Sequence, residues 1–304
     1  MAVDSGAQPL RLAGARVLQV AGDYTALLKP KIILLLIVTE LGAMIAAARG
    51  WPAPGPLFGG LAGGAMAAGG AGAINCWFDR DIDAVMPRTR RRPIPAGRIA
   101  PAEGLAFGIA VAVAGVIVIA LSSNLMAAVL AAAGGLFYVF VYTMWLKRST
   151  AQNIVIGGAA GAFPPLVGWA AVTGSLSPLA WALFALVFFW TPPHFWALAL
   201  LLRRQYSAVR VPMLPVVAGS AQTRRAILAY TAIMLVVSLV PAIWLGPWFG
   251  IASFVLGAIF LYLAWRAVRA EAEDGASALA LFHYSLVYLA LIFVAAAAAA
   301  VIPF

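Results

Sequence analysis

Three oxygen-bearing side chains follow one another at intervals of four residues, Asn75, Asp79 and Asp83. On an α-helix each such step advances about 400°, so the three side chains stay within a stripe of roughly 80°. Carboxylate and amide oxygens are ligands for hard cations such as Mg²⁺, which binds few protein oxygens and keeps several waters. The spacing predicts a metal-binding and catalytic site on one helix, which continues through Asp83 and ends before Pro87.

The surroundings of these three residues allow two interpretations. The cluster could be a solvated helix end whose acids pair with neighbouring arginines. However, Asn75 lies one to two turns inside an apolar segment, where an amide without a role is costly. We therefore favour a functional site, with guanidinium groups downstream that suit phosphate oxygens. Asp81 falls about 200° from Asp79 on a helix, and we expect it to form an ion pair with an arginine of the run 88–92.

The composition places the chain in a lipid bilayer. Of its 304 residues, 64% are hydrophobic and 10% charged, with a mean hydropathy of +0.99. Because a spanning helix needs about 20 apolar residues, the sequence predicts an all-α bundle. Its nine expected spans lie near 32–48, 57–78, 103–121, 125–143, 154–172, 179–200, 227–245, 249–267 and 280–302.

The distribution of basic residues argues against a nucleic-acid partner, although the net charge is +10. All Lys and Arg residues except Arg49 fall in the N-terminal segment or in alternate loops between the expected spans. By the positive-inside rule the N-terminus is cytoplasmic and the C-terminus lies on the opposite side. We expect a cytoplasmic tail over 1–26 and a single membrane domain over 27–304. The single cysteine, Cys76, excludes an internal disulfide.

Two proline pairs lie within expected spans, Pro164-Pro165 and Pro192-Pro193. Proline pairs predict broken helices, which are tolerated where they line a cavity or are buried in protein. With the nearby aromatic residues, they predict a central chamber that opens to the cytoplasmic side. Glycines crowd the second span, which indicates close helix packing and leaves room for a bulky ligand.

Three isolated ionisable residues remain unassigned. His194 follows the second proline pair, and a lone histidine on an apolar helix is more often a core residue than a ligand. His283 is subject to the same reading. Glu40 lies near the middle of the first span, where a carboxyl group is a functional candidate by default, without an identifiable partner.

Several motifs together resemble the UbiA-type intramembrane prenyltransferases, and among them the haem O synthases. The resemblance covers roughly residues 24 to 290. It rests on four stretches in order, Asn75-x3-Asp79-x3-Asp83 with its extension through Met86-x-Arg88-Thr89-x-x-Arg92-Pro93, Leu146-Lys147-Arg148-x-Thr150-x-x-Asn153, Trp190-Thr-Pro-Pro-His-Phe-Trp196, and Val211-Pro-Met-Leu-Pro215.

The resemblance implies transfer of the farnesyl group of farnesyl diphosphate to a vinyl group of haem B, with addition of water. It implies that Asn75, Asp79 and Asp83 hold Mg²⁺, and that haem A synthase is a possible partner in a bacterial inner membrane. The implied diphosphate-binding residues are Arg88, Arg92, Lys147 and Arg148. The candidate haem-binding residues are His194, Arg203, Arg204, Tyr206 and Arg210.

One departure concerns the metal. Family members carry a second acidic motif after the sixth span, whereas this chain has Gln205 before Tyr206 and no acid between Arg203 and Pro212. A second metal at this loop is therefore in doubt, and direct contact by arginines is the better expectation. The alternatives are another UbiA-type enzyme acting on a quinone precursor or chlorophyllide, and a secondary transporter. Transporters place ionisable groups near the bilayer midplane, whereas this acidic cluster lies at a helix end.

Overall fold

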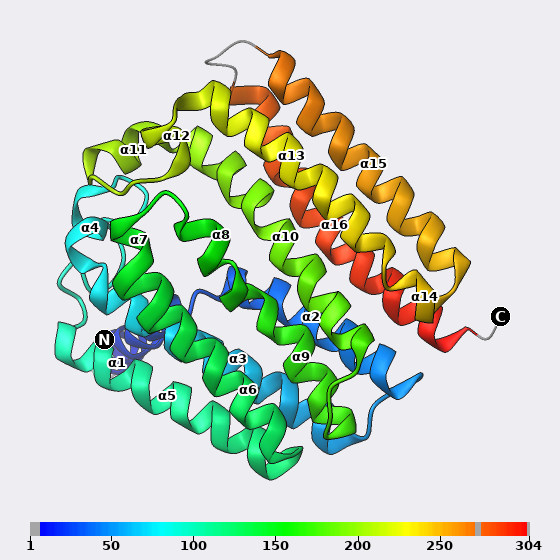
Figure 1. Cartoon of the computed structure of the whole chain (residues 1–304). Helices are drawn as coiled ribbons and strands as arrows, with labels where there is room; N and C mark the ends of the chain where they lie inside the picture. The colour runs from blue at the N-terminus through cyan, green and yellow to red at the C-terminus, as the bar shows by residue number, and fades with distance from the viewer. Residues whose placement is uncertain (1–6, 271–274, 303–304) are drawn as a thin grey trace, which may run out of the picture.

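The computed structural model describes residues 7–270 and 275–302, and over these ranges every regular element is a helix (Figure 1). The expected all-α class is confirmed. Nine helical segments of the described chain are long and apolar enough to cross a membrane. They run Pro30–Ala48, Gly55–Phe78, Pro101–Ser122, Leu125–Ser149, Asn153–Thr173, Pro178–Leu201, Gly219–Leu245, Pro247–Arg269 and Gly275–Val301.

These segments match the nine expected spans, although the seventh begins earlier than predicted. Five of them are single helices, namely α2 (Pro30–Ala48), α5 (Pro101–Ser122), α10 (Pro178–Leu201), α15 (Pro247–Arg269) and α16 (Gly275–Val301). The other four are composite: η1 (Gly55–Gly60) with α3 (Leu61–Phe78); α6 (Leu125–Leu136), η2 (Phe137–Leu146) and α7 (Lys147–Ser149); α8 (Asn153–Gly157) with α9 (Ala159–Thr173); and α13 (Gly219–Leu239) with α14 (Ala242–Leu245). The chain is thus a multi-pass membrane protein.

The short elements that follow spans gather at one end of the bundle. They are α4 (Arg80–Val85), α11 (Arg203–Ala208) and α12 (Leu214–Val217), and Figure 1 shows them beside α7, away from the C-terminus. This is the end that the positive-inside rule assigns to the cytoplasm. The bundle therefore brings the charged motifs from separate loops to one face.

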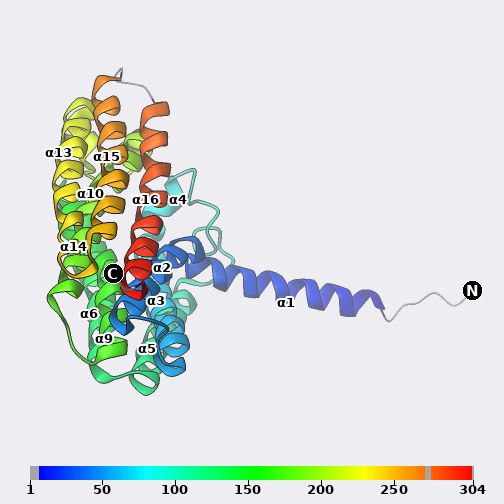
Figure 2. The same cartoon turned by 90° about the vertical axis from the view of Figure 1, so that its right-hand side faces the viewer.

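Helix α1 (Ala7–Leu27) covers most of the expected cytoplasmic tail. It projects sideways from the bundle in Figure 2 rather than packing along the spans. Its C-terminal end is anchored, because Leu27 is buried with Ala73 and Cys76 of α3, and because Arg98 Nε lies 2.9 Å from an Asp23 carboxylate oxygen.

The expected interruption of the helices at the proline pairs is wrong. Helix α10 continues through Pro192 and Pro193, and α9 continues through Pro164 and Pro165. Proline has a helical φ, and it disrupts a helix by removing a donor and by crowding the preceding turn. In a bundle the packing of neighbouring helices can hold such a segment helical, and α10 is largely buried around both prolines. The fifth span is instead divided at Gly158, between α8 and α9.

Candidate functional site

Asn75, Asp79 and Asp83 lie at a junction between two helices rather than on one uniform helix. Asp79 ends α3 with φ −84° and ψ 9°, and α4 begins at Arg80. The hydrogen-bond ladder continues across the junction, because Asp79 N donates to Asn75 O at 2.9 Å and Asp83 N donates to Asp79 O at 2.8 Å. The helical path ends at Val85, as expected before Pro87, and all three side chains are buried.

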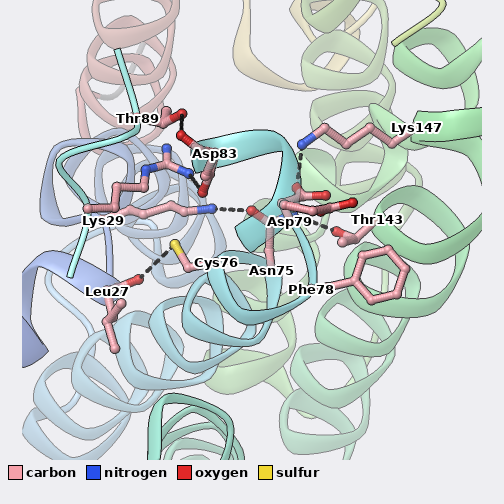
Figure 3. Close-up of polar contacts among 12 residues, drawn as sticks. Leu27, Lys29, Asn75, Cys76, Phe78, Asp79, Asp83, Thr89, Thr143 and Lys147 are labelled. Atoms are coloured by element: carbon pink, nitrogen blue, oxygen red, sulfur yellow. Dashed lines mark hydrogen bonds and ion pairs between the residues drawn. The ribbon is translucent and has the colours of Figure 1, made fainter. Parts of the chain in front are cut away.

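Asn75 has a defined amide orientation. Lys29 Nζ donates to Asn75 Oδ1 at 2.5 Å, whereas Asn75 Nδ2 donates to Asp79 Oδ2 at 2.8 Å and to Thr143 Oγ1 at 3.0 Å (Figure 3). An ammonium group can only donate, so the amide must present its oxygen to Lys29. The amide nitrogen therefore faces Asp79.

Asp79 is fully buried and is held by cations from the fourth loop. Lys147 Nζ donates to Asp79 Oδ2, and Arg148 Nη2 lies 3.3 Å from Oδ1. Both basic residues follow η2, a π-helix that also carries Thr143. Because π-helical turns displace the following residues relative to a regular α-helix and often occur at functional sites, η2 sets the position from which Thr143 meets Asn75 and Lys147 meets Asp79.

The remaining two aspartates have different partners. Asp83 accepts from Arg92 Nη1 at 2.6 Å, and its side chain is 4% exposed. Asp81 is exposed and forms a bidentate ion pair with Arg148. Arg148 Nη1 lies 2.8 Å from Asp81 Oδ2, and Nη2 lies 2.8 Å from Oδ1. These hydrogen bonds hold the pKa of Asp81 at about 2. The expectation that Asp81 pairs with the run 88–92 is thus wrong, because Arg148 reaches it across the bundle.

The sixth loop contributes Tyr206 to this cluster. Its phenol is buried and interacts electrostatically with Arg88, Arg92, Asp79 and Asp83. Burial raises the pKa of Tyr206, so the phenol stays neutral. The three arginines of the same loop, Arg203, Arg204 and Arg210, are exposed, and Arg203 Nη1 lies 3.4 Å from Ser220 Oγ.

His194 does not join the carboxylate cluster through any described contact. It is buried between α10 and α16, where its Nδ1 lies 2.6 Å from Ser285 Oγ and its ring stacks on Trp190 at 4.4 Å. His283 is exposed beside Phe282. These positions leave the roles of both histidines as predictions.

Glu40 is buried between α2, α3 and α9. Among the described residues its Oε1 has no hydrogen-bond partner. A Cβ atom added to Gly64 would lie 3.0 Å from Glu40 Cδ, and one added to Gly168 would lie 3.1 Å from Cγ. Glycines on both neighbouring helices therefore make the space that this carboxyl group occupies.

The chemistry of Asn75, Asp79 and Asp83 suits a hard divalent cation. Over the described ranges no three residues of His, Cys, Asp and Glu form a group that could hold a metal ion. The available ligands are two buried carboxylates and one amide, all hard oxygen donors, and a diphosphate would supply the rest. The cations now paired with these carboxylates could turn to phosphate oxygens. Gln205 has a buried Oε1 without a partner in the described structure.

Two residues of this cluster were not predicted from the sequence. Lys29 counted only toward the positive-inside distribution, and Thr143 carried no signal because a threonine in an apolar span is common. Pro30 directly follows Lys29, and a proline at the first position of a helix indicates a defined turn before it. This was the only signal in the sequence that pointed to Lys29.

Comparison with curated proteins identifies similar chains. A protoheme IX farnesyltransferase of Acidiphilium cryptum is 50% identical over 285 residues, which cover 90% of this chain and 89% of that protein. The protoheme IX farnesyltransferase of Granulibacter bethesdensis is 49% identical over 293 residues, which cover 91% and 90%.

Solved structures share the fold at low sequence identity. A digeranylgeranylglyceryl phosphate synthase superposes with a TM-score of 0.75 at 17% identity, over 93% of this chain and 99% of that one. A UbiA homologue from Archaeoglobus fulgidus bound to GPP and Mg²⁺ gives 0.69 at 16% identity, over 92% and 100%. The model of the UbiA prenyltransferase family matches residues 35–287. The chain therefore belongs to the UbiA prenyltransferase family.

Proposed function

We infer that the chain is a farnesyltransferase that acts on haem B and farnesyl diphosphate and produces haem O and diphosphate. The observation that carries this inference is identity of about 50% over most of the chain to curated protoheme IX farnesyltransferases. The geometry agrees with it, because buried oxygen ligands and cations from separate loops meet at one end of the bundle. A transporter is disfavoured by membership of a prenyltransferase family.

We assign the metal-binding and catalytic role to Asn75, Asp79 and Asp83. When bound, Mg²⁺ neutralises diphosphate and stabilises it as a leaving group. Divalent metal use is supported by family structures solved with Mg²⁺ and with Cd²⁺. The absence of an acid at Gln205 favours a single ion held by protein ligands.

Basic side chains take the charge that develops as the C–O bond of farnesyl diphosphate breaks. We assign this role to Arg88, Arg92, Lys147 and Arg148. Three of them already lie on the aspartates that we assign to the metal, so they are gathered where the diphosphate would bind. Cations fixed before the reaction stabilise the leaving group without the cost of reorganising solvent.

The organic steps require no covalent enzyme intermediate. The haem vinyl group attacks the allylic carbon as diphosphate leaves, a new C–C bond forms, and the positive charge moves to the former vinyl carbon. Water then adds to that carbon and loses a proton, which gives the hydroxyethylfarnesyl group. Apolar spans around the bound farnesyl chain would keep other water from the allylic cation.

The sixth loop and α10 supply the candidate haem contacts. The propionates need cationic partners near the cytoplasmic face, and the exposed Arg203, Arg204 and Arg210 are candidates, with Tyr206 at the inner side of the same loop. His194 is a candidate haem contact deeper in the bundle. We further propose an inner-membrane location with a cytoplasmic N-terminus, a single domain over 27–304 after a tail, and delivery of the product to haem A synthase.

The test is a reconstitution of the reaction. Purified protein is given haem B, farnesyl diphosphate and Mg²⁺, and the extracted pigments are weighed by mass spectrometry. A haem heavier by a farnesyl group plus water, absent with EDTA or in Asp83→Ala, is the expected result. Mg²⁺-dependent prenylation of a quinone precursor without any haem adduct would overturn the substrate and keep the reaction class.

A further inference from the structure

We propose that Lys29 is a further diphosphate-binding residue, which holds Asn75 Oδ1 in the substrate-free chain and turns to a phosphate oxygen when the prenyl diphosphate binds. This proposal rests on the proposed function, because it takes the diphosphate substrate as given. It adds a site residue from the turn between α1 and α2, a part of the chain outside all the motifs discussed above.

The charge balance around Asn75 is the first observation. Three cations of the cluster, Arg92, Lys147 and Arg148, have aspartate partners. Lys29 forms no ion pair with a carboxylate anywhere in the described chain. Its ammonium meets Asn75 Oδ1, Tyr138 Oη at 3.3 Å and the face of the Tyr138 ring, 5.8 Å from the ring centre. A partly buried ammonium with neutral partners alone is costly. The site therefore has a positive charge without a counter-anion, which a diphosphate would supply.

The backbone of Lys29 is the second observation. Lys29 has φ 57° and ψ 58°, a left-handed conformation that is unfavourable for a side chain with a Cβ atom. Lys29 follows the last residue of α1 by two positions, where glycine is the usual residue in this conformation. Backbone strain at Lys29, where glycine would be unstrained, points to a role for the lysine side chain.

The surroundings hold this strained turn in place. Leu27 is fully buried, with its carbonyl 4.0 Å from Cys76 Sγ, and Pro30 starts α2 with a fixed φ. The carbonyl of Lys29 accepts from Ile32 N at 2.9 Å. Figure 3 shows the lysine side chain extended from this turn toward Asn75. The ammonium is thus positioned before any ligand arrives.

The orientation of Asn75 explains why Lys29 and a metal ion would exchange partners. While Lys29 holds Oδ1, Asn75 offers its amide nitrogen to Asp79. Asn75 can serve as an oxygen ligand beside Asp79 only if the amide turns and Lys29 gives up its acceptor. A phosphate oxygen of the diphosphate would then accept a hydrogen bond from the released Lys29 ammonium.

Binding of inorganic pyrophosphate with Mg²⁺, measured by isothermal titration calorimetry on the detergent-purified full chain, tests this role without turnover. Lys29→Gln keeps a donor and removes the charge, Lys29→Arg keeps the charge, and Lys29→Gly removes the side chain and relieves the strain. Lys31→Gln is the matched control, because Lys31 is exposed two residues away. Loss of one charge-assisted contact should weaken binding about 10- to 100-fold in Lys29→Gln and Lys29→Gly.

Lys29→Arg should stay within about tenfold of the unmodified chain, and Lys31→Gln should match it. Lys29→Gly should retain its melting temperature, and haem B binding, followed by its visible absorption, should be unchanged in every variant. Unchanged pyrophosphate affinity in Lys29→Gln overturns the proposal, as does a joint loss of haem binding and melting temperature, which indicates a structural role. Pyrophosphate binding that depends on Lys29, without any haem adduct in the reconstitution, would overturn the haem assignment alone.

Discussion

Replacing Asp79 by asparagine should separate the stability of the cluster from its chemistry. Asp79→Asn keeps the shape of the side chain but removes the charge that Lys147 and Arg148 share. Loss of one partner of a fully buried ion pair costs about 3–5 kcal/mol, and of an exposed pair less than about 1 kcal/mol. The Lys147 side chain is 15% exposed and Asp79 is 0% exposed. We therefore expect a loss of about 2–3 kcal/mol in unfolding free energy.

The double variant Asp79→Asn with Lys147→Met supplies the magnitude test. It removes the ammonium that the single variant leaves without its carboxylate, so about 1–2 kcal/mol of the lost stability should return. Turnover should not return, because a metal ligand is still missing. We expect a decrease of about 10³-fold in both variants, which corresponds to about 4 kcal/mol.

The free energy of unfolding is measured in mixed detergent micelles, and turnover is measured as haem O formation by mass spectrometry. Asp81→Asn is the control, because Asp81 also contacts Arg148 but is exposed, with a side chain 62% accessible. It should lose less than about 1 kcal/mol and retain turnover. Asp79→Asn with turnover within about tenfold of the unmodified chain would refute the ligand role, and a double variant less stable than the single one would refute the ion-pair reasoning.

Three further predictions follow from other contacts. Arg92→Ala should raise the KM for farnesyl diphosphate about tenfold, with a smaller change in kcat, because Arg92 Nη1 lies 2.6 Å from Asp83 Oδ2 and can turn to phosphate. An unchanged KM in steady-state kinetics would contradict that role. Because the pKa of Asp81 is lowered to about 2, its pair with Arg148 stabilises the fold at pH values above the unfolded pKa, and this stabilisation is lost as the pH falls toward 2. The melting-temperature difference between Asp81→Asn and the unmodified chain should be constant from about pH 5 to 9 and shrink below about pH 4. A change of this difference within the neutral range would argue against the ion pair. Gly70→Ala would place a Cβ atom 2.5 Å from the Gly108 carbonyl oxygen, where α3 meets α5, and should lower the free energy of unfolding by about 1–3 kcal/mol. A Cβ atom at Gly161 would meet nothing within 4 Å, so Gly161→Ala is the control. Equal melting temperatures for the two variants would show that the helices separate easily.

The sequence alone determined the membrane architecture. Whether a segment spans a bilayer depends on its own length and hydropathy, so the spans could be located without knowing their neighbours. The spacing of Asn75, Asp79 and Asp83 likewise placed them close together, because four-residue steps are a local property of a helix. The backbone hydrogen bonds of the helix continue across the junction at Asp79, from Asn75 through Asp83.

Only the tertiary structure decided which cation meets which acid. Lys147 lies 68 residues from Asp79, and Lys29 lies 46 residues from Asn75, so these contacts depend on how α2, α3 and η2 pack. The sequence offered an arginine run beside Asp81, but Arg148 occupies both its oxygens. The proline pairs show the same limit. A missing donor disrupts an isolated helix, whereas α10 is buried in the surrounding bundle and continues through both prolines.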